Sequence, residues 1–321
     1  MALNDKLKHG NMKRAFLLLM VITVLNTKAQ QDPQYNMYQF NQMLINPAYA
    51  GSRDGISAVA SHRQQWVGFD GAPQTTALSV HSPIMKKNLG VGLTIYNDKM
   101  GPRNLMAFYG NVAYILKINN KAKLSFGMNA GYNRYQFNFA MIKFKEGEVP
   151  SQLLQTQTPG ALDINSGLYF KTQSFFAGLS ATHLNAPNVY TYQSVTPGGS
   201  TFSYRLKTHL FFTIGKSWII DKNVIFAPTS MVKMVGNKFT ADLNLNFFLY
   251  KKVWLGAFYR AGYGPGGLIQ YYVNNKFRVA YSFDSGISDA RRLGGSHEVS
   301  LSFDFLGSKP TNAKTVNPRF L

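Results

Sequence analysis

The chain contains no cysteine, so it has no thiol nucleophile. Histidine is then the side chain best suited to act as a general acid or base. No histidine beyond residue 29 lies at a telling spacing from a serine or an aspartate, although His81 and His209 come from distant segments that a fold could bring together. The acidic residues are scattered and show no metal-ligand spacing. We therefore expect no enzyme activity, no metal site and no cofactor. The histidines considered are His62, His81, His183, His209 and His297.

Two other features imitate ligand sites without the context that such sites need. The glycines between Gly262 and Gly267 resemble a phosphate loop, but no helix follows them, and a β-turn is the better interpretation. The net charge of +20 is high, yet lysine and arginine occur singly at turns, without a basic stripe or a recognition motif. We expect no nucleic-acid partner.

Segments in which apolar and polar residues alternate make up most of the chain. In the final one, Val299, Leu301, Phe303 and Phe305 alternate with polar residues, and 239–247 and 277–284 repeat the pattern. Because successive side chains of a β-strand point to opposite faces, each segment has one apolar and one polar face. Many such segments joined by turns predict an all-β fold, a single antiparallel transmembrane β-barrel.

The segmentation gives fourteen strands, an even number as in single-chain bacterial barrels. Every second connection is tight, as at 85–88 and 250–251, whereas the others include the long loops 138–161, 185–200 and 286–295. This parity is typical of an outer-membrane barrel with both ends in the periplasm; the alternative, a soluble β-sandwich, would not need it. The predicted strands are 56–66, 74–83, 89–98, 104–117, 121–137, 162–171, 173–184, 201–217, 222–234, 237–249, 252–263, 267–274, 276–285 and 296–305.

A targeting segment precedes the strands. Two basic residues lead into the apolar run 15–25, and a small-x-small pattern ends at Ala29, before Gln30. We interpret 1–29 as a signal peptide cleaved between Ala29 and Gln30, because a membrane anchor would need ~20 apolar residues. Residues 1–29 hold five lysines and arginines and one aspartate, so the mature chain keeps +16 of the total charge of +20.

The mature chain divides into three parts. Residues 30–55 do not alternate and contain Pro47 and Gly51, which predicts an irregular segment at or inside the barrel mouth. Residues 56–305 form the predicted barrel, and 306–321 form a short periplasmic tail.

Four stretches of the chain carry a family resemblance. They are NPAYAGSRDG at 46–55, RQQWVGFDGAPQT at 63–75, LGVGLTIYNDKMGPRN at 89–104 and GSHEVSLSFDF at 295–305. In this order they resemble the PorP/SprF family of outer-membrane proteins from the type IX secretion system of Bacteroidota. The resemblance extends from about Gln31 to the tail. The motif positions are Asn46, Pro47, Ala48, Gly51, Arg63, Gln65, Trp66, Gly68 and Pro73.

Most of these motif residues have a structural interpretation. Asn46 and Pro47 fit the opening of a turn, Gly51 fits a positive φ, and Trp66 fits an interfacial aromatic belt. Arg63 and Gln65 share the polar face of their strand. We expect that face in the lumen, where these side chains pair with lumen acids or hold the amino-terminal segment. Direct contact with cargo is the alternative.

The resemblance implies a role in protein secretion and gliding. Members are part of the export machinery, or helpers that export or anchor a surface protein such as an adhesin. The implied partners are a secreted cargo protein bearing a carboxy-terminal domain, periplasmic components of the same system, and outer-membrane lipid. A passive porin is the competing hypothesis, because a barrel of this size is wide enough for a water-filled lumen.

Each mouth of the barrel has a candidate contact surface. The long loops carry aromatic residues suited to a cargo interface: Phe137, Phe139, Phe144, Tyr190 and Tyr192. The tight turns carry lysines, and with the tail they offer a basic rim that could dock an acidic periplasmic component or attract lipid head groups. The residues chosen to represent this rim are Lys251, Lys252, Lys314 and Arg319.

Overall fold

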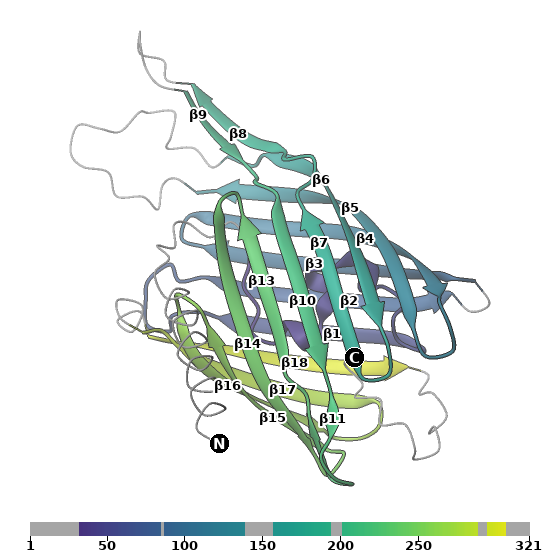
Figure 1. Ribbon diagram of the computed structural model, residues 1–321. Coiled ribbons are helices and arrows are strands. Elements are labelled where there is room, and N and C mark those ends of the chain that lie inside the picture. Colours follow the sequence, from purple (N-terminus) through teal and green to yellow (C-terminus); the bar gives the residue numbers. More distant parts are fainter. Residues whose placement is uncertain (1–31, 85–86, 139–156, 194–200, 288–293, 306–321) are drawn as a thin grey trace, which may run out of the picture.

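A closed antiparallel β-barrel forms the wall of the molecule (Figure 1). The computed structural model describes residues 32–84, 87–138, 157–193, 201–287 and 294–305. The predicted signal peptide and carboxy-terminal tail lie outside these residues. Within the described residues, no helix is long and apolar enough to cross a membrane.

Fourteen wall strands follow one another around the ring, which confirms the predicted number. Every pairing is antiparallel, and Ile56 of β1 pairs with Phe305 of β18 to close the barrel. Two wall strands are interrupted, so that β11 continues β10 and β12 leads into β13. The wall elements are β1 (Ile56–Gln64), β2 (Gln74–Ile84), β3 (Leu89–Met100), β4 (Arg103–Lys117), β5 (Lys123–Phe137), β6 (Gly160–Lys171), β7 (Phe175–Thr182), β10 (His209–Lys216), β11 (Trp218–Ile219), β12 (Val224–Phe226), β13 (Thr229–Val235), β14 (Lys238–Leu249), β15 (Val253–Arg260), β16 (Gly264–Tyr272), β17 (Phe277–Ser285) and β18 (Gly295–Phe305).

The prediction that 201–217 forms a single wall strand is wrong. Residues 201–205 belong to a separate hairpin, in which β8 (Asn188–Gln193) pairs with β9 (Thr201–Arg205), and the wall strand begins only at His209. This hairpin rises beyond the barrel from the end that carries the long loops (Figure 1). The sequence pattern missed the break because the residues between β9 and β10 contain neither glycine nor proline.

Alternation sorts the side chains of the wall between lumen and lipid. In β4, Leu105, Ala107 and Tyr109 are buried, whereas Met106 and Phe108 are exposed. In β18 the polar Glu298, Ser300 and Ser302 are buried and the apolar Val299 and Leu301 are exposed. In β18 the polar face therefore points inward and the apolar face outward, and the outward face of β4 is likewise apolar, the arrangement expected when lipid surrounds the wall.

The amino-terminal segment, residues 32–55, lies inside the ring of strands and is drawn in purple in Figure 1. It contains three single turns of 3-10 helix, η1 (Tyr38–Phe40), η2 (Gln42–Leu44) and η3 (Pro47–Tyr49), and most of its side chains are buried. It begins beside β7 and β10 at the long-loop end and reaches β1 at the tight-turn end. We call it the plug segment.

Candidate functional site

The plug segment is seated against a wall in which glycines remove the side chains that would block it. A Cβ atom at Gly127 would lie 2.2 Å from the Ala48 nitrogen, and one at Gly90 would lie 2.2 Å from the Ala50 oxygen. At Gly167 it would lie 2.1 Å from Asn46 Oδ1. These contacts are impossible for any residue with a side chain. Glycine within a strand often marks such a close approach of another backbone, so the glycines of these strands are a signal of the plug segment that the sequence contains.

Asn46 joins the plug segment to the wall. Its Oδ1 accepts a hydrogen bond from the Ala48 nitrogen at 2.9 Å, which caps η3 and opens the turn, as predicted. Its Nδ2 donates to the backbone oxygens of Leu168 at 2.9 Å and of Leu179 at 3.5 Å, on two neighbouring strands. The same side chain therefore shapes the segment and anchors it.

Arg63 lies at the centre of a buried charged cluster. Its Nη1 is 2.8 Å from Asp284 Oδ2 and 3.6 Å from Glu298 Oε2, and all three side chains are almost fully buried. The pairing with lumen acids expected from the polar face of the strand is thus present. Asn36 of the plug segment completes the cluster, because its backbone nitrogen donates to Glu298 Oε2 at 2.7 Å and its Nδ2 donates to Asp284.

A second buried ion pair, between β14 and β15, also holds the plug segment. Arg260 donates from Nε to both carboxylate oxygens of Asp242 at 3.0 Å. Its remaining nitrogens donate to Gln34 Oε1 at 3.0 Å and to the Tyr35 backbone oxygen at 3.2 Å. A planar guanidinium suits this use, since one group satisfies the wall acid and the segment at once.

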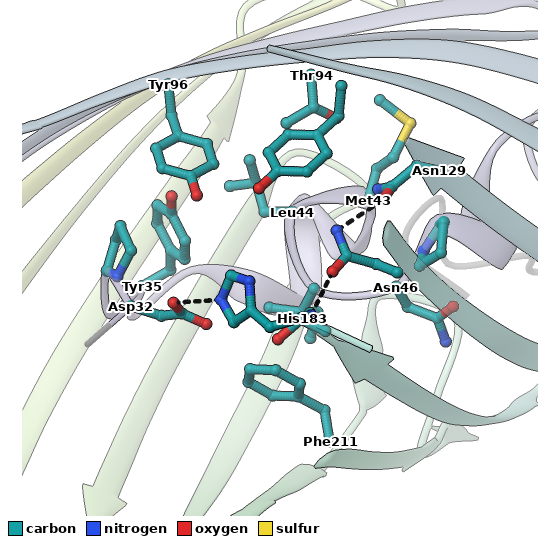
Figure 2. Close-up of a pocket in the computed structure, with 16 residues that line it drawn as sticks. Asp32, Tyr35, Met43, Leu44, Asn46, Thr94, Tyr96, Asn129, His183 and Phe211 are labelled. Carbon is teal, nitrogen blue, oxygen red and sulfur yellow. Dashed lines mark hydrogen bonds and ion pairs between the residues drawn. The ribbon is translucent and has the colours of Figure 1, made fainter. Parts of the chain in front are cut away.

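Asp32 contacts two histidines of the wall at the long-loop end, and Figure 2 shows the contact with His183. Asp32 Oδ1 lies 2.8 Å from His183 Nε2, and Asp32 Oδ2 lies 2.5 Å from His209 Nδ1. His81 and His209, which the sequence allowed to lie close together, are far apart in the structure. His81 lies near the tight-turn end, where its Nδ1 accepts a hydrogen bond from the Gly51 nitrogen at 3.2 Å.

The charges of the plug segment are stabilised where they lie. Burial acts to raise the pKa of the Asp32 carboxyl, but His183 and His209 outweigh it and hold that pKa well below its usual range. Burial acts to lower the pKa of the Arg53 guanidinium, yet Tyr49 and Asp304 raise it above its ordinary value. Both groups are therefore charged at neutral pH.

The other motif residues shape the loop between β1 and β2. Gly51, in the plug segment before β1, has a φ of 71°, as predicted, and Gly68, in the loop, has one of 98°. The Gln65 backbone nitrogen donates to the Pro73 oxygen at 2.9 Å, which closes the loop. Trp66 lies after β1 rather than in it, half-buried and with a φ of 47°.

Aromatic side chains pack together beneath the β8–β9 hairpin. The ring of Phe137 lies 5.9 Å from that of Tyr135, 6.0 Å from that of Tyr190 and 5.9 Å from that of Tyr204. Of the predicted contact residues, Phe137 and Tyr190 are thus brought together. Tyr192 lies in β8, and Phe139 and Phe144 lie outside the described residues.

Lysines collect at the tight-turn end. Lys171 turns inward and donates to the Ser52 oxygen at 2.5 Å, so it belongs to the plug contacts. The exposed ones in the described residues are Lys87, Lys117, Lys121, Lys216, Lys222, Lys251, Lys252 and Lys276. Lys314 and Arg319 of the predicted docking surface lie outside the described residues.

Two small cavities lie beside the plug segment in the described part of the chain. The cavity next to Asp32, lined also by Tyr35, His183 and Phe211, has a volume of about 50 Å³ (Figure 2). A further cavity beside Arg260 has about 20 Å³. These spaces admit a few water molecules, not a solute stream or a polypeptide.

Comparison with known proteins assigns the chain to a family. The family model described as type IX secretion system membrane protein PorP/SprF matches residues 27–303. The chain belongs to this family. A search of curated proteins finds no match.

Solved outer-membrane barrels share the architecture of this PorP/SprF chain. The CymD monoaromatic hydrocarbon channel aligns with a TM-score of 0.50 and 12% identity, over 84% of this chain and 93% of its own. The TodX deltaS2S3 mutant monoaromatic hydrocarbon channel has a TM-score of 0.49 and 10% identity, covering 89% and 98%. A Pseudomonas aeruginosa FadL homologue has a TM-score of 0.46 and 12% identity, covering 86% and 95%. At these identities the likeness concerns the fold alone.

The family and the fold together place the chain in the outer membrane as a membrane protein of the PorP/SprF type IX secretion family. The expectation drawn from the resemblance is therefore confirmed at this level.

The Arg63 cluster gives a test of how the plug segment is held. We expect Arg63→Met to destabilise the barrel by ~3–5 kcal/mol, because it leaves two acids buried without a cation. Chemical unfolding in lipid vesicles measures this loss. The triple variant Arg63→Met, Asp284→Asn, Glu298→Gln is the control and should recover most of the stability. Equal stability of the single variant and the parent would contradict the role assigned to Arg63.

Proposed function

We propose that this chain is a closed outer-membrane scaffold of the type IX machinery that helps export or surface-anchor a secreted protein, such as an adhesin. The observation that carries the proposal is the filled lumen. Glycines at the closest approaches, two buried arginine clusters and Asn46 hold the plug segment across the lumen. A barrel closed in this way acts through its two mouths rather than as a conduit.

The long-loop mouth is the proposed contact for cargo. The β8–β9 hairpin stands above the membrane wall, and its base is fixed by Tyr135, Phe137 and Tyr204. A rigid hairpin on an aromatic base presents a surface with little entropy to lose on binding, which favours recognition of a folded domain. The proposed partner is a secreted protein that carries the carboxy-terminal domain of this system.

The tight-turn mouth is the proposed contact for a periplasmic component. The wall begins at Ile56 and ends at Phe305 on that side, whereas Asp32, the first described residue, lies at the long-loop end. Its exposed lysines create a field of one sign that attracts and orients an acidic partner. Attraction to anionic lipid head groups is the competing explanation.

The filled lumen separates the scaffold from a passive porin. In planar lipid bilayers the parent protein should show no steady conductance, whereas a variant lacking residues 32–54 behind an intact signal sequence should conduct, since the lumen then fills with water. Correct insertion of both proteins is checked by heat-modifiable migration on gels. Steady conductance of the parent at the level of the deletion variant would favour the porin.

The hairpin should be required for surface display. Replacing residues 188–205 by a short Gly-Ser linker is expected to abolish display of the cognate cargo while the barrel still inserts, because the wall strands do not depend on β8 and β9. Whole-cell labelling of secreted proteins measures display. Substitution of lipid-facing Leu243→Met serves as the matched control. Normal display of every cargo by the hairpin variant would contradict the receptor role.

The lysine surface should be required for docking. Lys251→Glu with Lys252→Glu should lower co-purification of periplasmic components and make the remainder more sensitive to salt, while Lys251→Arg with Lys252→Arg should preserve it. Both variants should insert. If the glutamate variant exports and co-purifies as the parent does at physiological salt, the lysines serve lipid contact instead.

A further inference from the structure

A cluster of three possible metal ligands lies where the plug segment begins, formed by Asp32, His183 and His209. The other contacts that hold the plug segment do not depend on this cluster. Each of the three residues offers one ligand atom, and these atoms lie within 4.8 Å of one another. They come from three separate places: the start of the plug segment, the residue after β7, and the first residue of β10. Sequence spacing could not reveal the group, because more than 150 residues separate Asp32 from either histidine.

The surroundings of His183 are those of a metal-ligating histidine. Its Nδ1 lies 2.7 Å from Asp163 Oδ2, and this carboxylate also accepts from the Tyr109 hydroxyl at 2.7 Å. A carboxylate on Nδ1 holds the ring so that the other nitrogen, Nε2, faces Asp32, and Nε2 can ligate a metal once it gives up its proton. Metal-bound histidines typically have this second partner.

The backbone of His183 is held in a conformation that only a specific set of contacts maintains. Its φ is 56°, its nitrogen donates to Asn165 Oδ1 at 2.7 Å, and its oxygen accepts from Thr208 Oγ1 at 3.1 Å. Such left-handed conformations cost roughly 1 kcal/mol or more and collect at ligand sites. This constraint fixes the direction of the imidazole ring.

His209 supplies the second, independent indication of a ligand. Its side chain is 1% exposed, and neither ring nitrogen makes a hydrogen bond within the residues that the structure describes, although Nδ1 faces Asp32 Oδ2 at 2.5 Å. The two imidazole rings meet edge to face with their centroids 5.5 Å apart. Figure 2 shows the His183 ring beside Asp32 at the edge of the cavity of about 50 Å³. This cavity leaves room for a water molecule as a further ligand.

We propose that Asp32, His183 and His209 bind one divalent transition-metal cation, with zinc as its representative, and thereby fasten the start of the plug segment to the wall. Two imidazole nitrogens and one carboxylate oxygen suit zinc, nickel or copper, whereas magnesium and calcium prefer oxygen ligands throughout. Three protein ligands and a water complete a tetrahedral zinc site. In the metal-free arrangement the carboxylate bridges the two rings.

Binding requires only a small movement. Ligand distances of about 2.0–2.1 Å in a tetrahedral site separate neighbouring ligand atoms by ~3.3 Å. The present separations from Asp32 are 2.8 Å and 2.5 Å. The cation enters as the carboxylate withdraws by less than about 1 Å from each ring and the two histidine nitrogens, which lie within 4.8 Å of each other, close to the same separation. The histidines release their protons on binding.

The test uses the full mature chain without an affinity tag, folded in detergent and stripped with a chelator. Equilibrium dialysis against buffered Zn²⁺, followed by elemental analysis, should give one zinc per chain. Asp32→Asn and His209→Gln should each weaken binding by at least ~10-fold, and the positioning variant Asp163→Asn by about 10–100-fold. His62→Gln, at an exposed histidine, is the matched control and should bind as the parent does.

X-ray absorption at the zinc edge and hydrogen exchange keep the proposal falsifiable if a buried variant folds poorly. The parent should show two imidazole ligands and a light oxygen shell, and zinc should slow exchange across residues 33–38 specifically. Absence of stoichiometric zinc, a first shell without histidine, or equal binding by the Asp32→Asn/His209→Gln double variant would overturn the site. In each case the three residues would form only an ion-paired contact between the plug segment and the wall. None of these measurements depends on the proposed export role.

Discussion

The absence of water from the bilayer core is the constraint on which the rest of this structure depends. Every backbone polar group in the wall must be paired within the protein, so the strands close into a ring at β1 and β18. A ring of fourteen strands is wider than its own inward side chains can fill. The polar inner faces of the strands therefore need either water or protein against them, and in this chain the plug segment supplies the protein.

The plug contacts explain why the lumen carries charges that a soluble core would avoid. A buried arginine with two acids adds little net stability, because desolvation offsets most of the attraction. It does specify position, since Asn36 completes the Arg63 cluster only in one placement, and Gln34 and Tyr35 meet Arg260 only in one. The close approaches at Gly90 and Gly127 add a steric condition to the electrostatic one. Together they define one path through the lumen.

Much of the fold could be predicted because alternation is a local property. The pattern Val299, Leu301, Phe303 with Glu298, Ser300, Ser302 fixes both the strand and its two faces without knowledge of any partner. The same reasoning placed Arg63 in the lumen. Alternation could not identify the acids that pair with Arg63. Those pairs depend on which residues of β1, β17 and β18 face one another, and closure of the whole ring sets that register. Asp32, His183 and His209 escaped for the same reason, and strand 201–217 was wrong because a hairpin and a wall strand share one alternating pattern.

The path of the plug segment connects the two ends of the molecule. Asp32 meets β7 and β10 near the long loops, and Ser52 meets Lys171 near the tight turns. Between them the segment contacts strands on every side of the ring, from Asn46 on β6 and β7 to Tyr35 on β15. Such a segment cannot leave the lumen one contact at a time, because releasing Asn36 alone exposes two acids that Arg63 only partly neutralises. Opening the barrel would therefore require the arginine clusters, Asn46 and the Asp32 contacts to break together.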